Sequence, residues 1–168
     1  MINYSSISAT VNDPSSMISE LVSLWIDDFC RNVSNHEILE VNLGHCSYLF
    51  DNTADRVIAA WGISYGKSSE VRDKSRMAGH PLGNGKNYHR GHTIPHTMGG
   101  GTDINLVPQL GKVNIGPFRV LERKAVATPN SLYFTYCKYP NASTQTPSGV
   151  DQGFVAPGGS LEFESFIN

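Results

Sequence analysis

Three histidines and an arginine lie within eight residues of this chain, in the segment HRGHTIPH at 89–96. Imidazole groups can transfer protons near neutral pH, and they are also common metal ligands. His89, His92 and His96 are three and four residues apart, which on a helix would place all three on one face, as a zinc site requires. The spacing therefore leaves three interpretations: a zinc-binding trio, a proton-transfer site, or a cluster without chemistry.

The residues between the histidines disfavour a helix. Gly91 weakens a helix by about 1 kcal/mol and Pro95 by about 3 kcal/mol, because proline also lacks the N–H that the helix would use. The segment is therefore predicted to be extended. In an extended chain His92 and His96 share one face while His89 points to the other, so the trio is expected to diverge.

A second polar group follows downstream. A glycine run at 99–101 and the segment NLVPQ at 105–109 precede a predicted helix that begins near Asn114. Asparagine is favoured at a helix start, and Pro117 falls in the first turn, where the missing N–H costs nothing. Asn114 lies on the same face as the apolar stripe of this helix, so its carboxamide is expected to point inward, where it needs a polar partner. Glu122 places a carboxylate on the flank of that face.

In this order, these residues resemble the DNA/RNA non-specific endonucleases, in the branch whose signature is Asp-Arg-Gly-His and whose core is a ββα-metal, or His-Me finger, motif. The residues that carry the resemblance are RGH at 90–92, NLVPQ at 105–109, Asn114, and the LE pair at 121–122. Asn114 follows Asn105 by nine residues and precedes Glu122 by eight, which is similar to the spacing of that family. The similarity extends over about residues 46–127.

The resemblance implies a metal-dependent nuclease that hydrolyses phosphodiester bonds of DNA, RNA or both with little sequence preference. His92 would be the general base that activates water. Asn114 would be the direct protein ligand of one Mg²⁺, with Mn²⁺ or Ca²⁺ as alternatives. Arg90 would hold a phosphate or the fold of the motif, and Glu122 would orient a metal-bound water or stabilise the site from behind the metal ligand.

Other polar residues are expected around the same site. Asn105 is interpreted as a structural amide or as a support for the metal ligand. The family has Asp immediately before Arg-Gly-His, whereas this chain has His89, and losing the acid lowers the expected metal affinity and rate. His89 would then contact a phosphate or have no role. A local basic groove is expected from the positive side chains of the predicted helix, namely Lys112, Arg119, Arg123 and Lys124.

The elements that must position these residues indicate an α+β fold with an antiparallel sheet and flanking helices, in a single domain over 1–168. An amphipathic pattern predicts a helix over about 16–32, and a β-prone pair around DNTAD predicts a hairpin. The remaining predictions are hairpin strands near 46–51 and 56–64, a polar excursion at 66–87, strands at 131–140 and 160–167, and turns at 140–159. The histidines and Asn114 would thus follow the hairpin and precede the last strands.

Composition limits the function classes. With 39% hydrophobic and 17% charged residues, the chain is neither disordered nor a charge-rich coiled coil. A formal net charge of -2 argues against a protein that grips nucleic acid by a bulk positive field, but it does not exclude an enzyme with a metal ion. No secretory signal or membrane span is predicted, so we expect a cytoplasmic protein or one delivered by a non-classical route.

By analogy, a small nuclease of this kind is expected to act as a toxin or effector, with nucleic acid as substrate and an immunity protein as inhibitor. Two alternatives stay open. Because His89 replaces the acid of the signature, the chain could be a catalytically weakened nuclease fold that only binds nucleic acid. The histidine trio could instead make it a zinc protein.

Overall fold

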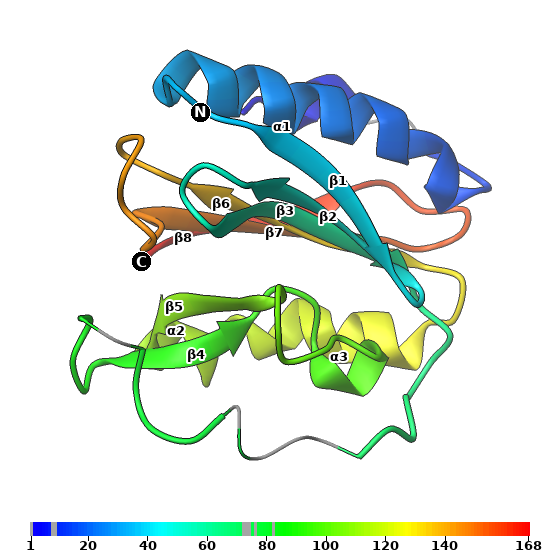
Figure 1. Ribbon diagram of the computed structural model, residues 1–168. Coiled ribbons are helices and arrows are strands. Elements are labelled where there is room, and N and C mark those ends of the chain that lie inside the picture. The colour runs from blue at the N-terminus through cyan, green and yellow to red at the C-terminus, as the bar shows by residue number, and fades with distance from the viewer. Residues whose placement is uncertain (1, 8–9, 72–74, 76, 82) are drawn as a thin grey trace.

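The computed structural model describes residues 2–7, 10–71, 75, 77–81 and 83–168 (Figure 1). Its main sheet is six-stranded and antiparallel, in the order β1-β2-β3-β6-β7-β8. These strands are β1 (Ile38–Leu43), β2 (Cys46–Asp51), β3 (Arg56–Ile63), β6 (Leu132–Lys138), β7 (Gly149–Val155) and β8 (Glu162–Ile167). The predicted α+β class with an antiparallel sheet is confirmed.

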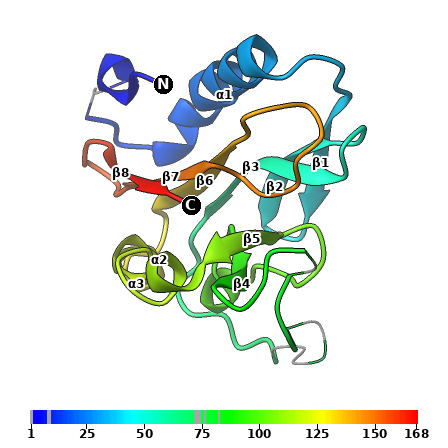
Figure 2. The ribbon, with the colours of Figure 1, turned by 90° about the vertical axis from the view of Figure 1, so that its left-hand side faces the viewer.

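Two layers cover the main sheet. The helix α1 (Ile18–Asn32) lies on one face (Figure 1). The other face carries the strands β4 (Tyr88–His92) and β5 (Leu106–Leu110) with the helices α2 (Gly111–Asn114) and α3 (Arg119–Ala127), which Figure 2 shows side by side. This second layer contains the histidine segment, so the sheet is the platform on which the candidate site is built.

The predicted helix at 16–32 is confirmed as α1 and the 3₁₀ turn before it. Asp13 caps that turn by accepting a hydrogen bond from the backbone N–H of Ser15 at 2.9 Å. One helical face then buries Leu21, Trp25 and Phe29 at intervals of four residues. The ring of Trp25 lies 5.1 Å from that of Phe134 on β6, which anchors the helix on the middle of the sheet.

Polar side chains in the sheet, or directly after one of its strands in the case of Ser64, hold the second layer in place. Each donates a hydrogen bond of 2.7 Å to a backbone carbonyl oxygen of that layer: Thr135 to Thr93, Gln152 to Phe118, and Ser64 to Ala125. All three donors are buried. Because a buried donor without a partner costs about 1–3 kcal/mol, these bonds specify where the second layer docks on the sheet.

The strands at 46–51, 56–64, 131–140 and 160–167 are confirmed as β2, β3, β6 and β8, but the prediction of turns throughout 140–159 was wrong. Residues 149–155 of that stretch form β7, a fully buried strand between β6 and β8. The strand was not predicted because its glycine and polar residues resemble those of a turn. Gly153 leaves room for the ring of Phe134, and Gln152 donates to the hydroxyl of Tyr133 at 2.7 Å. Both partners, Phe134 and Tyr133, lie on the neighbouring strand β6, so the sequence of 149–155 alone does not predict this strand.

Two further predictions need correction. The helix expected to begin near Asn114 begins at Arg119, and Asn114 ends the short α2 instead, because Gly116 and Pro117 separate two helical pieces. The edge strand β1 was not predicted at all. At the other edge β8 is mostly exposed, with Ile167 84% exposed.

The excursion predicted at 66–87 contains no helix or strand among its described residues, while positions 72–74, 76 and 82 lie outside the description. None of the helices in the described part of the chain combines the length and the apolar character needed to span a bilayer.

The contact between β7 and β6 predicts the effect of a single methyl group. A Cβ at position 153 would lie 2.1 Å from Cζ of Phe134, so Gly153→Ala is expected to lower the free energy of unfolding by about 1–3 kcal/mol. Gly101→Ala is the control, because no atom lies within 4 Å of its added Cβ. Urea unfolding followed by tryptophan fluorescence measures both, and equal stabilities would contradict the packing described.

Candidate active site

A cavity of about 440 Å³ opens between β4, the 3₁₀ turn η3 (His96–Met98) and α3. Its lining includes the polar residues Lys67, Arg90, His92, His96, Asn114, Arg119, Glu122 and Arg123. Apolar side chains such as Pro95 and Val126 complete the wall. The candidate base, metal ligand and acid thus meet in one cavity although 30 residues separate His92 from Glu122.

The β4–β5 hairpin sets the direction of the histidines. His92 pairs with Leu106, and His89 pairs with Gln109, in an antiparallel ladder. Arg90 and His92 are two residues apart on the strand, so both point to the cavity, and His89 points away from it. The predicted extended conformation is confirmed for His89–His92 in β4, whereas His96 begins the 3₁₀ turn η3. His92 is 7% exposed, and its ring lies 6.3 Å from that of His96.

The glycine between Arg90 and His92 is required by close packing. A Cβ on Gly91 would lie 2.3 Å from Oε1 of Gln109, a buried residue of β5 two positions beyond Val107, which pairs with Gly91. The glycine therefore lets the two strands of the hairpin pair over a buried glutamine, and this keeps its neighbours Arg90 and His92 on the cavity side.

Asn105 fixes the chain directly after His92. Its Oδ1 accepts from the backbone N–H of Ile94 at 2.7 Å, and its Nδ2 donates to the Ile94 carbonyl at 2.7 Å and to the Gly101 carbonyl at 3.0 Å. The hydroxyl of Thr93 also donates to Oδ1. Asn105 is fully buried and does not line the cavity, so the structure supports the structural half of its two expected roles.

Asn114 reaches the cavity from the end of α2. Its Nδ2 lies 3.4 Å from Nδ1 of His89, which accepts the hydrogen bond in the tautomer that carries its proton on Nε2. This contact uses the amide nitrogen, so Oδ1 is the atom that Asn114 can offer to a cation. The ring of His89 stands over Gly111, where an added Cβ would be 2.7 Å from Nε2. His89 thus contacts the proposed metal ligand from outside the cavity.

The helix α3 supplies the charged wall. Arg119, Glu122 and Arg123 follow one another at helical spacing and line the cavity, while Leu121 and Ala125 are buried on the other face. The basic groove expected from the sequence is therefore present, but with fewer of the predicted basic residues. Two of its predicted members do not line the cavity: Lys112, and Lys124, which forms a salt bridge with Glu162.

Sequence reasoning gave no site role to two basic residues that line the cavity, Lys67 and His96. Lys67 enters from the polar excursion, 25 residues before His92, and His96 had been given no role. No motif marks Lys67, because its place depends on backbone contacts between distant segments. Among the residues that the structure describes, Lys67, Arg90, Arg119 and Arg123 line the cavity as cationic residues, and Glu122 is the acidic one.

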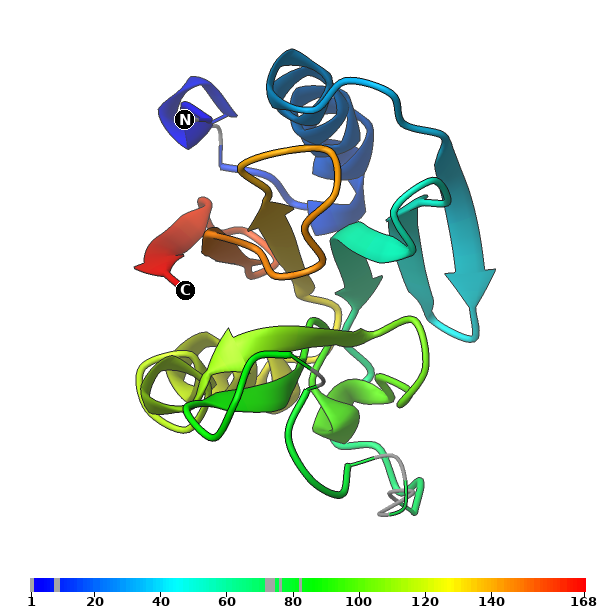
Figure 3. The ribbon, with the colours of Figure 1, turned by 60° about the vertical axis from the view of Figure 1, so that its left-hand side comes forward.

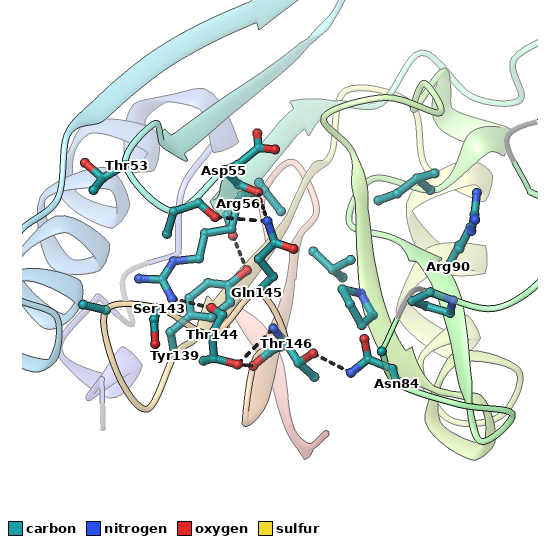
Figure 4. A pocket seen from close by; sticks show the side chains of 18 of the residues that line it. Thr53, Asp55, Arg56, Asn84, Arg90, Tyr139, Ser143, Thr144, Gln145 and Thr146 are labelled. Atoms are coloured by element: carbon teal, nitrogen blue, oxygen red, sulfur yellow. Dashed lines mark hydrogen bonds between the residues drawn. The ribbon is translucent and has the colours of Figure 1, made fainter.

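A larger cavity of about 1150 Å³ lies between the β2–β3 turn and the loop joining β6 to β7, which arches over β5 in orange in Figure 3. Its lining is mainly uncharged, and Arg90 stands apart from the other labelled side chains in Figure 4. The Arg56 guanidinium is engaged by Asp51 at 3.0 Å and by the Thr144 carbonyl. Gln145 Nε2 donates to the Ala54 carbonyl at 3.3 Å. These groups tie loops together, so the smaller cavity is the better site for a polyanion.

Comparison with known proteins settles the family. A family model described as DNA/RNA non-specific endonuclease matches residues 57–151, more than half of the chain. The chain belongs to this family. The match includes His92, Asn114 and Glu122, so the cavity lies inside the nuclease region.

Two solved structures share the fold of this endonuclease. One is NucA from Streptococcus agalactiae with no metal bound, at 15% identity and a TM-score of 0.55, covering 80% of this chain and 72% of that one. The other is NucA from the same organism with a magnesium ion bound, at 13% identity and a TM-score of 0.57, covering 87% and 88%. At such identities the likeness shows the fold alone. No curated protein matches the chain.

The part of the chain that the structure describes contains no group of three or more His, Cys, Asp or Glu side chains that could hold a metal ion. His89 faces away from the cavity that His92 and His96 line. The zinc-protein alternative therefore lacks a ligand set among these residues.

The Asn105 contacts predict a specific defect. Asn105→Ala removes the partners of both backbone groups of Ile94 and is expected to lower the free energy of unfolding by about 2–4 kcal/mol. Nuclease activity should fall even where the variant remains folded, because the chain after His92 is no longer fixed. Chemical unfolding and plasmid nicking measure the two effects.

Asn42→Ala is the matched control, since Asn42 is exposed and accepts one hydrogen bond from Ser47. An Asn105→Ala variant as stable and as active as Asn42→Ala would show that the Asn105 amide is not needed to position His92.

Proposed function

We propose that this endonuclease hydrolyses phosphodiester bonds of DNA, RNA or both in the cavity of His92, with a divalent metal ion, Mg²⁺ in the first instance. The observation that carries the proposal is that His92, Asn114 and Glu122 line one cavity together with four cationic side chains. Phosphate groups are polyanionic, so such a lining suits them.

His92 is the general base. Its imidazole takes a proton from a water molecule, the water oxygen bonds to phosphorus, and the bond from phosphorus to the 3′-oxygen breaks. The departing 3′-oxygen takes up a proton from solvent water, so the products carry a 5′-phosphate and a 3′-hydroxyl. Because water is the nucleophile, the 2′-hydroxyl of RNA is not required, and both DNA and RNA can serve as substrates.

The side chains around the cavity fit a hard cation better than zinc. Asn114 Oδ1 and the Glu122 carboxylate are oxygen donors, and Mg²⁺ prefers few protein oxygens while keeping several waters. Asn114 would hold the ion directly and Glu122 would orient one of its waters. When bound, the ion supplies stabilisation of negative charge on the phosphate oxygens and on the leaving oxygen.

The cationic lining serves binding rather than base recognition. Arg90, Arg119 and Arg123 offer guanidinium groups that pair with phosphate oxygens in two-point contacts. Such contacts carry no sequence information, which agrees with little sequence preference. We propose that the whole chain is one nuclease domain, since the larger of two core clusters includes residues from Ile2 to Val155.

In biological terms, we place this endonuclease among toxins or effectors held in check by an immunity protein, on the analogy of small nuclease domains. The competing function is a nuclease fold that binds nucleic acid without cutting it, for which His89 in place of the signature acid is the motivation. Salt-sensitive DNA binding without cleavage would support that alternative.

Loss of the base predicts loss of cleavage. His92→Ala is expected to reduce Mg²⁺-dependent nicking of supercoiled plasmid by about 10²–10⁴-fold, the usual contribution of a general base. His45→Ala is the control, because His45 is exposed and lies outside the cavity. If the wild-type protein cuts neither plasmid nor RNA with Mg²⁺, Mn²⁺ or Ca²⁺, the proposed nuclease activity is refuted. The alternative, a nuclease fold that only binds nucleic acid, would then stand.

Loss of the metal ligand predicts a metal-specific defect. Asn114→Ala is expected to raise the Mg²⁺ concentration for half-maximal cleavage roughly tenfold or more, while Asn114→Asp, which keeps an oxygen donor, should retain metal binding. Mn²⁺ binding followed by electron paramagnetic resonance measures affinity without turnover. Equal Mn²⁺ affinity in the wild type and Asn114→Ala would remove Asn114 from the site.

A further inference from the structure

His96 is the histidine of the opening segment that the proposed chemistry does not use. It begins η3, is half-buried, and lines the same cavity as His92. Both of its ring nitrogens face backbone carbonyl oxygens: Nε2 lies 3.1 Å from that of Glu70 and Nδ1 lies 3.4 Å from that of Gly100. In the tautomer that carries its proton on Nε2, His96 donates to the Glu70 carbonyl at the shorter of the two distances.

The shorter of these contacts joins two segments that are distant in the sequence. The Nε2–H of His96 donates to the Glu70 carbonyl, and the backbone N–H of Ser68 donates to the carbonyl of Thr97 at 2.8 Å. Both bonds connect η3 to residues 68–70. This short stretch of the polar excursion is thereby held against the rim of the cavity at two points.

Lys67 directly precedes the held stretch and is one of the residues that line the cavity. A lysine in a glycine-rich excursion would otherwise sample many positions, and ordering a residue costs about 1–2 kcal/mol of backbone entropy. The hydrogen bonds to η3 offset this loss of entropy, so the segment is already ordered when a substrate binds. The ammonium group, a compact charge with three donors, suits a phosphate oxygen.

We infer that His96 is a positioning residue that holds residues 68–70 against η3 and so keeps Lys67 in the cavity as a contact for a phosphate group of the nucleic-acid strand. The inference rests on the proposed function, because it assigns these residues to the same cavity. It concerns binding of the strand and leaves the proton transfer to His92. Losing His96 should therefore weaken substrate binding while turnover of bound substrate continues.

A matched pair of variants tests the donor at position 96. Methionine and glutamine have similar length, but only glutamine offers an N–H to the Glu70 carbonyl. Dissociation constants are measured by fluorescence anisotropy with a labelled duplex oligonucleotide and Mg²⁺, in a His92→Ala background that blocks cleavage. His96→Met and Lys67→Ala are each expected to weaken binding by about 3–10-fold, and His96→Gln should restore most of it.

Two further readouts separate positioning from general damage. The plot of log affinity against log salt should become shallower by about one for both His96→Met and Lys67→Ala, because each loses the same phosphate contact. The double variant should bind no more weakly than Lys67→Ala alone. With His92 present, KM should rise in His96→Met while kcat stays within about twofold of the wild type.

The inference is overturned if His96→Met binds like the wild type, if the two effects add, or if Lys67→Ala leaves the salt dependence unchanged. The Lys67 measurement decides the matter even where His96→Met does not fold. Wild-type cleavage is assayed in parallel: a wild type that binds but never cuts refutes the proposed function alone, and a wild type that cuts while Lys67→Ala and His96→Met bind normally refutes this inference alone.

Discussion

The arrangement of the site depends on one buried carboxamide. Asn105 lies on the far side of the turn from His92, yet its two polar atoms bond to both backbone groups of Ile94. A buried amide cannot move without losing these bonds, so the chain leaving β4 has one path. Thr135 then connects this path to the main sheet through the Thr93 carbonyl. The direction of the His92 imidazole is thus set by groups that never touch the cavity.

Local patterns in the sequence predicted those parts of the fold that local physics determines. The periodic face of α1 and the β-prone hairpin of β2 and β3 are examples, and the proline and glycine in the histidine segment correctly indicated a strand. The site residues of the family motif could be proposed because their spacing survives in the sequence. Their meeting in one cavity could only be seen in the structure.

The parts that escaped prediction depend on partners elsewhere in the chain. β7 contains glycine and glutamine because Phe134 and Tyr133 on the neighbouring strand require space and a donor. The start of α3 was misplaced because Pro117 has the same local signature in a first helical turn and in a break between two helices. Lys67 precedes a stretch that is bonded to η3 by the Ser68 N–H and by the His96 side chain, and no local sequence pattern predicts these two bonds.

The backbone at Gly91 and Gly100 supports the cavity of His92, although neither glycine lines it. A methyl group at Gly91 would overlap the side chain of Gln109, and one at Gly100 would lie 1.9 Å from the carbonyl oxygen of Ile94. Neither position carries a reactive group, yet neither tolerates even the smallest side chain. Substitutions at Gly91 and Gly100 would therefore inactivate this endonuclease without removing a reactive group. The cause would be the close packing of the main chain at these two positions.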